Sequence, residues 1–129
     1  MKLKTLTTGL AAALISLGAA GVAFAGDVRS GTFTGASNHI TKGAVEVVKV
    51  DDGYEIRLKG DFWFDGAPDP RVGLGRDGKF VKETDFEILR ANAGEQVYKV
   101  PADIDPSTFD DVLIWCRKFS VPLGVAALN

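Results

Sequence analysis

Short segments in which apolar and polar residues alternate predict β-strands along the first half of the chain. Residues 44–50 (AVEVVKV) are rich in β-branched side chains, and residues 54–59 alternate between apolar and charged positions. An Asp-Gly pair lies between them in residues 51–53 (DDG), which is typical of a tight hairpin turn. We expect a positive φ at Gly53 and a bend at Gly60 before the aromatic residues 62–64.

The second half of the chain continues the pattern with short segments separated by turn-forming residues. Strands are expected there over residues 71–74, 86–90, 96–100, 112–119 and 120–127, and a further short strand is expected in the first half over residues 32–34. Asp105 followed by Pro106 predicts one short helical turn, with the aspartate as its N-cap. Many short strands with frequent turns predict an all-β fold, a compact antiparallel β-sandwich or barrel-like domain.

The N-terminus has the pattern of a cleavable secretory signal peptide. Lys2 and Lys4 precede an apolar segment over residues 10–23, and the sequence Ala-Phe-Ala ends at Ala25. The apolar segment is short for a membrane-spanning helix, which needs about 20 residues. We therefore expect a signal peptide over residues 1–25 and a single domain over residues 26–129, located in the bacterial periplasm or secreted. No transmembrane segment is expected after signal cleavage.

Composition narrows the classes of partner and site. With 15 basic and 17 acidic side chains, the chain lacks the positive charge on which nucleic-acid affinity depends, so we expect no nucleic-acid partner. A single cysteine excludes an internal disulfide and a multi-cysteine zinc site, and a single histidine adds little, so no metal site is predicted. No motif in the sequence indicates a particular cofactor. The expected partner is another exported protein or a redox partner.

Cys116 is the residue that bears most on function. If residues 112–119 form a strand, Val112, Ile114 and Cys116 share one face, while Leu113 and Trp115 share the other. A thiol on an apolar face is ordinarily buried and inert, whereas a reactive thiol needs partial exposure. Both interpretations stay open, and we expect low reactivity in the resting protein.

Three further groups of residues are candidates for a chemical role. His39 is a candidate cofactor-binding residue that could act with Cys116 if the fold brings the two together, and Trp115 is a candidate for the same role. The acidic cluster has the composition of a calcium loop, but its spacing lacks the glycine and glutamate of an EF-hand, so capping and solvation are favoured. This cluster consists of Asp103, Asp105, Asp110 and Asp111.

Several segments together resemble the DM-thirteen domain family, small secreted β domains that often accompany DOMON domains. Residues 112–119 (VLIWCRKF), 67–72 (APDPRV) and 94–101 (GEQVYKVP) resemble its motifs, and residues 119–128 resemble its closing segment. Gly73 departs from the pattern, because an aromatic residue is usual there. The resemblance implies a β-rich fold and a proposed electron-transfer or redox role, with Cys116 as the residue that carries it.

Three functions from different classes remain open at this point. The first is an exported redox or electron-transfer protein centred on Cys116, and it is uncertain whether this would make it an enzyme. The second is a non-catalytic binding or interaction module with Cys116 in the core. The third is a haem- or metal-binding module that uses Cys116 and His39. Exposure of Cys116 and its position relative to His39 discriminate among them.

Overall fold

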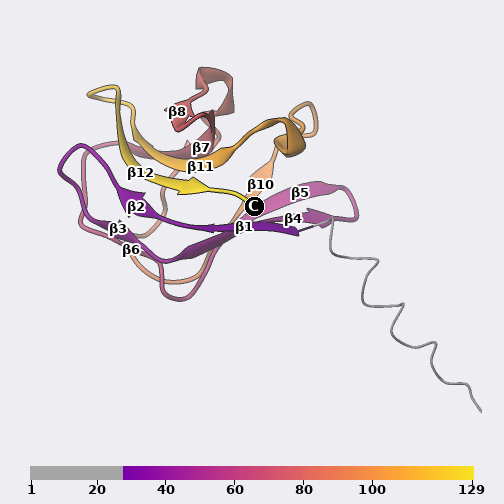
Figure 1. Cartoon of the computed structure of the whole chain (residues 1–129), viewed down its shortest axis with the longest axis horizontal. Coiled ribbons are helices and arrows are strands. Elements are labelled where there is room, and N and C mark those ends of the chain that lie inside the picture. Colours follow the sequence, from indigo (N-terminus) through magenta and orange to yellow (C-terminus); the bar gives the residue numbers. More distant parts are fainter. Residues whose placement is uncertain (1–27) are drawn as a thin grey trace, which may run out of the picture.

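The described part of the chain, residues 28–129, forms antiparallel sheets in two main layers in this computed structural model (Figure 1). The expected signal peptide and its cleavage site lie outside the described residues. Among the residues that are described, no helix has the length and apolar character needed to cross a membrane. The all-β prediction is confirmed.

The first layer is a four-stranded sheet built around the predicted hairpin. Its order is β1 (Val28–Thr32), β4 (Ala44–Val50), β5 (Gly53–Leu58) and β10 (Gln96–Val100). Val50 pairs with Gly53 across the turn, and Gly53 has the expected positive φ of 143°. At Gly60 the chain leaves this sheet, and the amide of Phe62 donates a hydrogen bond to the carbonyl of Lys59 at 3.0 Å.

The second layer is a six-stranded sheet with β11 near its centre. Its order is β2 (Thr34–Gly35), β12 (Val121–Ala127), β11 (Asp111–Cys116), β7 (Pro70–Arg76) and β8 (Lys79–Phe80), and β9 (Glu87–Ile88) also pairs with β7. A small third sheet joins β3 (Thr41–Lys42) to β6 (Trp63–Phe64). The strand predicted over residues 112–119 was too long at its end, because the chain turns after Cys116 and the amide of Ser120 donates to the Cys116 carbonyl at 2.8 Å.

The two layers are joined along one side by a strand that bends at Phe33. The Phe33 amide donates to the carbonyl of Gly43 at 2.9 Å, so β1 stays in the first sheet while β2 pairs with β12 in the second. At Gly31 the backbone lies so close to β12 that a Cβ atom would stand 2.1 Å from the Ala127 carbonyl oxygen. This side of the sandwich is therefore closed in the manner of a barrel.

The core lies between the layers and is mainly aromatic and aliphatic. Its largest fully buried side chains include Tyr98, Phe62, Phe64, Ile56, Leu58 and Leu74. Trp63 is the exception among the aromatic residues of β6, since 44% of it is exposed. The Tyr98 hydroxyl donates to the Gln96 side chain and accepts from the Arg90 amide at 3.0 Å, and burial raises the pKa of this phenol.

Two 3-10 turns complete the described residues. η4 (Pro106–Thr108) is the predicted helical turn, and the Asp105 carboxylate caps it by accepting from the Ser107 amide at 3.0 Å. η3 (Lys82–Thr84) was not predicted, because Val81 before it supplies no side-chain cap. η3 lies over β7, where it helps to cover the outer face of the six-stranded sheet.

Candidate functional site around β11

The Cys116 side chain lies on the core side of β11. It packs in the same buried cluster as Val112 and Ile114, as the alternation predicted, and only 1% of the residue is exposed. Its thiol donates a hydrogen bond to the carbonyl oxygen of Pro68, with Sγ and O separated by 3.2 Å. Pro68 itself is exposed, so the layer of protein over the thiol is thin at this point.

The segment that contacts the thiol, residues 65–69, is held at its first residue by the β2–β3 loop. The His39 Nδ1 and Asp65 Oδ1 atoms are 2.8 Å apart, and the Ile40 amide donates to Asp65 Oδ2 at 3.0 Å. Both contacts favour the ionised carboxylate, and the hydrogen bond to His39 is the main reason that the pKa of Asp65 is lowered. We call residues 65–69 the covering segment.

The covering segment is held at its last residue by two arginines. The Arg117 amide donates to the Asp69 carbonyl at 3.1 Å, and the Arg117 Nε lies 3.6 Å from the Asp69 carboxylate. The Arg71 guanidinium also reaches Asp69, at 3.9 Å. Asp69 adopts a positive φ of 48°, so these contacts fix a residue whose backbone is in an uncommon conformation.

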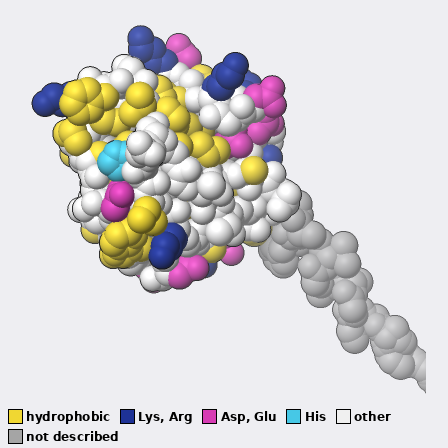
Figure 2. Space-filling model, turned by 60° about the vertical axis from the view of Figure 1, so that its left-hand side comes forward, with side chains coloured by type: hydrophobic (Ala, Val, Ile, Leu, Met, Phe, Trp, Pro, Cys, Tyr) yellow, Lys and Arg dark blue, Asp and Glu magenta, His cyan; other side chains and the backbone are white. Residues whose placement is uncertain are grey.

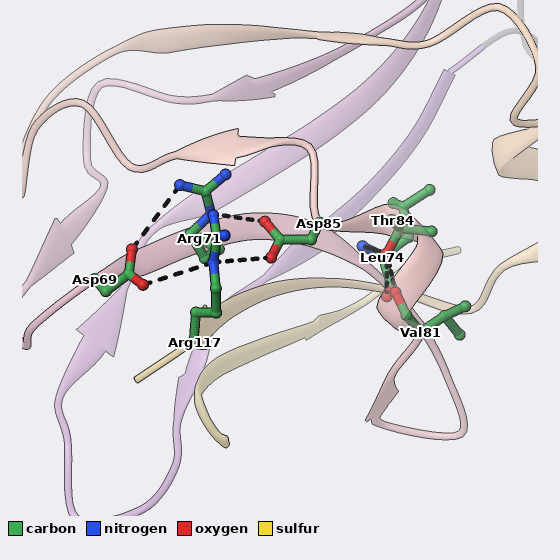
Figure 3. A network of polar contacts seen from close by, with 7 residues as sticks. All are labelled: Asp69, Arg71, Leu74, Val81, Thr84, Asp85 and Arg117. Carbon is green, nitrogen blue, oxygen red and sulfur yellow. Dashed lines mark hydrogen bonds and ion pairs between the residues drawn. The ribbon is translucent and has the colours of Figure 1, made fainter. Parts of the chain in front are cut away.

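Asp85 completes a network of four charged residues on the outer side of β7 and β11 (Figure 3). Its carboxylate accepts a hydrogen bond from Arg71 Nε at 2.6 Å and lies 3.4 Å from Arg117 Nε. Two carboxylates therefore face two guanidinium groups, and their charges balance. The network joins the covering segment to the chain that follows η3.

Trp115 points away from Cys116, to the outer side of the six-stranded sheet. Its ring stacks on that of Phe80, with 4.5 Å between ring centroids and 8° between the ring planes. Phe80 lies over Gly73, where a Cβ atom would stand 2.6 Å from the Phe80 ring. The Thr84 hydroxyl, also shown in Figure 3, accepts from the Leu74 amide at 2.8 Å and so fixes this cover to β7.

The structure separates the three candidate site residues. Cys116 and Trp115 are neighbours in sequence on opposite faces of β11, and His39 contacts Asp65. Figure 2 shows the histidine, in cyan, beside an acidic side chain on a face where hydrophobic side chains gather above and below it. The covering segment is what links His39 to Cys116, through Asp65 and Pro68.

Three members of the acidic cluster accept hydrogen bonds from backbone amides. Asp105 caps η4, Asp110 Oδ2 accepts from the Asp77 amide at 2.8 Å, and Asp111 Oδ2 accepts from the Gly78 amide at 2.6 Å. The last two fix the turn between β7 and β8. Among residues 28–129, no group of three or more His, Cys, Asp or Glu residues is arranged to hold a metal ion.

A family model described as electron transfer DM13 matches residues 32–128 of this chain. The chain belongs to this family. The match extends over nearly all the described residues, including His39, Trp115 and Cys116, and it confirms the resemblance to the DM-thirteen domain. No curated protein and no solved structure matches the chain significantly.

Within the DM13 domain, one of the segments that carried the resemblance has a clear structural role. The Gln96 side chain donates to the carbonyls of Ala91 and Gly94, at 2.9 and 3.2 Å, and accepts from the Tyr98 hydroxyl. The Gln-x-Tyr pattern therefore shapes the turn before β10. The departure at Gly73 is explained by Phe80, whose ring occupies the space next to it.

Sequence reasoning missed the residues that support the site. Asp65, Phe80 and Asp85 lie outside the segments that the sequence predicts as strands and outside the segments that resemble the family. A signal was present for Asp69, because it lies in the APDPRV segment that resembled the family. No local pattern pairs Asp85 with Arg117, which are brought together only by the sheet.

Proposed function

We propose that this DM13 domain is an exported electron-transfer protein in which Cys116 is the redox-active group. The observation that carries the proposal is the hydrogen bond from the thiol to Pro68, in a covering segment that is thin and is held by side-chain contacts at both ends. In the resting protein the thiol is enclosed. Displacement of the covering segment would bring it within reach of a partner without disturbing the sheet.

The chain has one cysteine, so the oxidised form of Cys116 must involve a group from outside the chain. In one-electron exchange, the thiol gives an electron to an oxidised centre of the partner and its proton to water. In thiol–disulfide exchange, the Cys116 thiolate attacks a partner disulfide, forms a mixed disulfide and releases one partner thiolate. Both routes need access to Sγ, and access therefore controls the rate.

The test compares alkylation and redox activity in the same purified protein. Labelling by a small maleimide should be much slower in the native protein than in the denatured chain. Slow oxidation by ferricyanide should consume one equivalent per chain, because two Cys116 thiols from two chains lose two electrons and two protons and form one disulfide. Cys116→Ala should abolish this consumption. Val112→Ala, a truncation on the same face of β11, serves as the control for loss of packing and should retain the full equivalent.

Two results would contradict the proposal. If native labelling is as fast as in the denatured chain, the thiol is not enclosed and the covering segment has no role. If the thiol is fully protected and Cys116→Ala leaves every redox assay and partner interaction unchanged, Cys116 serves only in packing. The second result would favour an interaction module, which the 1% exposure of Cys116 supports.

We also propose that the protein is exported to the periplasm or secreted. The charged start, the short apolar segment and the Ala-Phe-Ala sequence support this. Intact-mass measurement of the exported protein should give Gly26 as the first residue, and recovery of the full-length chain in the membrane fraction would contradict export by cleavage.

A further inference from the structure

A pocket of about 470 Å³ lies on the outer side of the six-stranded sheet, on the face of β11 opposite to Cys116. It lies between the cover made by β8 and η3 and the turn that follows β11. Its lining residues are Phe80, Lys82, Asp85, Trp115, Arg117 and Ser120. A volume in this range is typical of small-molecule sites, which combine an apolar surface with a few polar groups.

The aromatic part of the pocket is the stacked pair of Trp115 and Phe80. Their rings are stacked nearly parallel, so each ring shields one face of the other, and both residues are only partly buried, which leaves aromatic surface in the pocket lining. Gly73 beneath Phe80 has no side chain, and the Thr84 hydroxyl holds the backbone of the cover, so the pair is fixed in place. Flat molecules with delocalised electrons pack favourably against such a surface.

The charged part of the pocket favours an anion. Asp85 is paired with both Arg71 and Arg117, so its carboxylate is already neutralised. Arg117 is about half exposed, and Lys82 is an exposed residue for which the described part of the chain supplies no ion-pair partner. Because Arg117 is already balanced by Asp69 and Asp85, the uncompensated charge beside the aromatic surface is the ammonium of Lys82.

We propose that this pocket binds a planar aromatic molecule that carries a carboxylate or a similar acidic group. The ring of the ligand would lie against Trp115 and Phe80, and its acidic group would pair with Lys82. A cation does not fit, because Asp85 has no uncompensated charge to offer. The proposal does not depend on a redox role for Cys116, whose side chain lies on the opposite face of β11.

The test uses three related compounds and the indole signals of the protein. Naphthalene-2-carboxylate is the probe, naphthalene-2-carboxamide lacks its charge, and cyclohexanecarboxylate lacks its aromatic ring. The chain has two tryptophans, so Trp63→Phe identifies the Trp115 indole signal in an amide-correlation spectrum. Titration of the otherwise unchanged protein should shift the Trp115 signal, with the probe binding at least about fivefold more tightly than either control compound.

Substitution of the lysine then tests the charge. Lys82→Gln should weaken binding of the probe at least about threefold and leave binding of the carboxamide unchanged. Lys79→Gln, on the neighbouring strand but outside the pocket lining, is the matched control and should have no effect. Cys116→Ala should bind the probe normally, which separates this proposal from the redox role. Equal affinity for acid and amide, or an unmoved Trp115 signal, would overturn the proposal.

Discussion

The two faces of β11 differ in how they are covered, although the same six residues form both. The core face, with Val112, Ile114 and Cys116, is buried in the core cluster, and the covering segment lies over Cys116. The outer face is covered at Leu113, but at Trp115 it is covered only in part, by Phe80. A strand can therefore place a thiol in the core and, one residue earlier, an aromatic ring at a pocket. Residues that are neighbours in sequence on β11 therefore lie in separate environments.

The largest expected effect is on the core face. Ile114→Ala removes fully buried methyl groups and should lower the free energy of unfolding by about 2–5 kcal/mol. Ile88→Ala, the same substitution at a residue that is 48% exposed on β9, should change it by no more than about 0.5 kcal/mol. Urea denaturation measures both. Equal losses would mean that the two sides of the sheet are packed alike.

A side chain added at Gly73, beneath the cover made by β8 and η3, should also lower the free energy of unfolding. In Gly73→Ala the new Cβ would stand 2.3 Å from the Thr84 carbonyl oxygen and 2.6 Å from the Phe80 ring, so the cover must move. We expect a loss of about 1–3 kcal/mol and altered Trp115 fluorescence. Gly60→Ala is the control, because nothing lies within 4 Å of the added atom. An unchanged spectrum would show that Phe80 does not depend on Gly73.

Loss of the Thr84 hydroxyl should lower the free energy of unfolding by a slightly smaller amount. The hydroxyl accepts from the Leu74 amide and has carbonyl acceptors in Leu74 and Val81, at 2.9 and 2.7 Å, for its single proton. Thr84→Val leaves these buried groups unpaired and should lower the free energy of unfolding by about 1–2 kcal/mol. Thr84→Ser keeps the hydroxyl and should recover most of the loss in thermal denaturation. A Thr84→Val protein as stable as the unchanged protein would show that the hydroxyl does not hold the cover.

The smallest expected effect comes from substitution of Asp65 in the covering segment, and its effect on stability depends on pH. The pKa of Asp65 is lower in the folded protein than in the unfolded chain, so its contribution is present above the unfolded value of about 3.9 and is lost as the pH falls through the folded value. Asp65→Asn should remove this part of the acid dependence and speed labelling of Cys116 by 4,4′-dithiodipyridine at pH 5.

A matched aspartate separates opening of the covering segment from general loss of stability. The pKa of Asp52 is also lowered, by its hydrogen bond to Lys99, but Asp52 lies at the hairpin between β4 and β5. Asp52→Asn should reduce the acid dependence of stability and leave labelling of Cys116 unchanged. If both variants label equally fast, His39 and Asp65 do not hold the cover in place.

The local parts of the fold were predictable because they depend on neighbours in sequence. The hairpin at Gly53, the cap at Asp105 and the alternation that buries Cys116 all follow from residue type and spacing. The family membership was visible in separate motifs. What could not be predicted was the end of β11, because Arg117 and Lys118 continue the apparent pattern while Ser120 turns the chain back.

The candidate site was predictable only for the residues with unusual chemistry. Cys116, His39 and Trp115 stood out as rare side chains, but their separation into a core, a loop and an outer face depends on how the sheets meet. The covering segment and the pairing of Asp85 with Arg117 arise from contacts between distant parts of the chain. Such contacts leave no periodic trace in one sequence.

The strand that bends at Phe33 has a consequence for how the protein reaches its fold. β2 pairs with β12, and the Thr41 side chain donates to the Leu123 carbonyl, a contact between residues 82 positions apart. β2 thus obtains its partner only when β12 is available, and an all-β topology with such distant pairings folds in milliseconds to seconds. A growing chain that still lacks β12 would leave β2 without its partner and β11 without one of its two neighbours, so the six-stranded sheet would be incomplete.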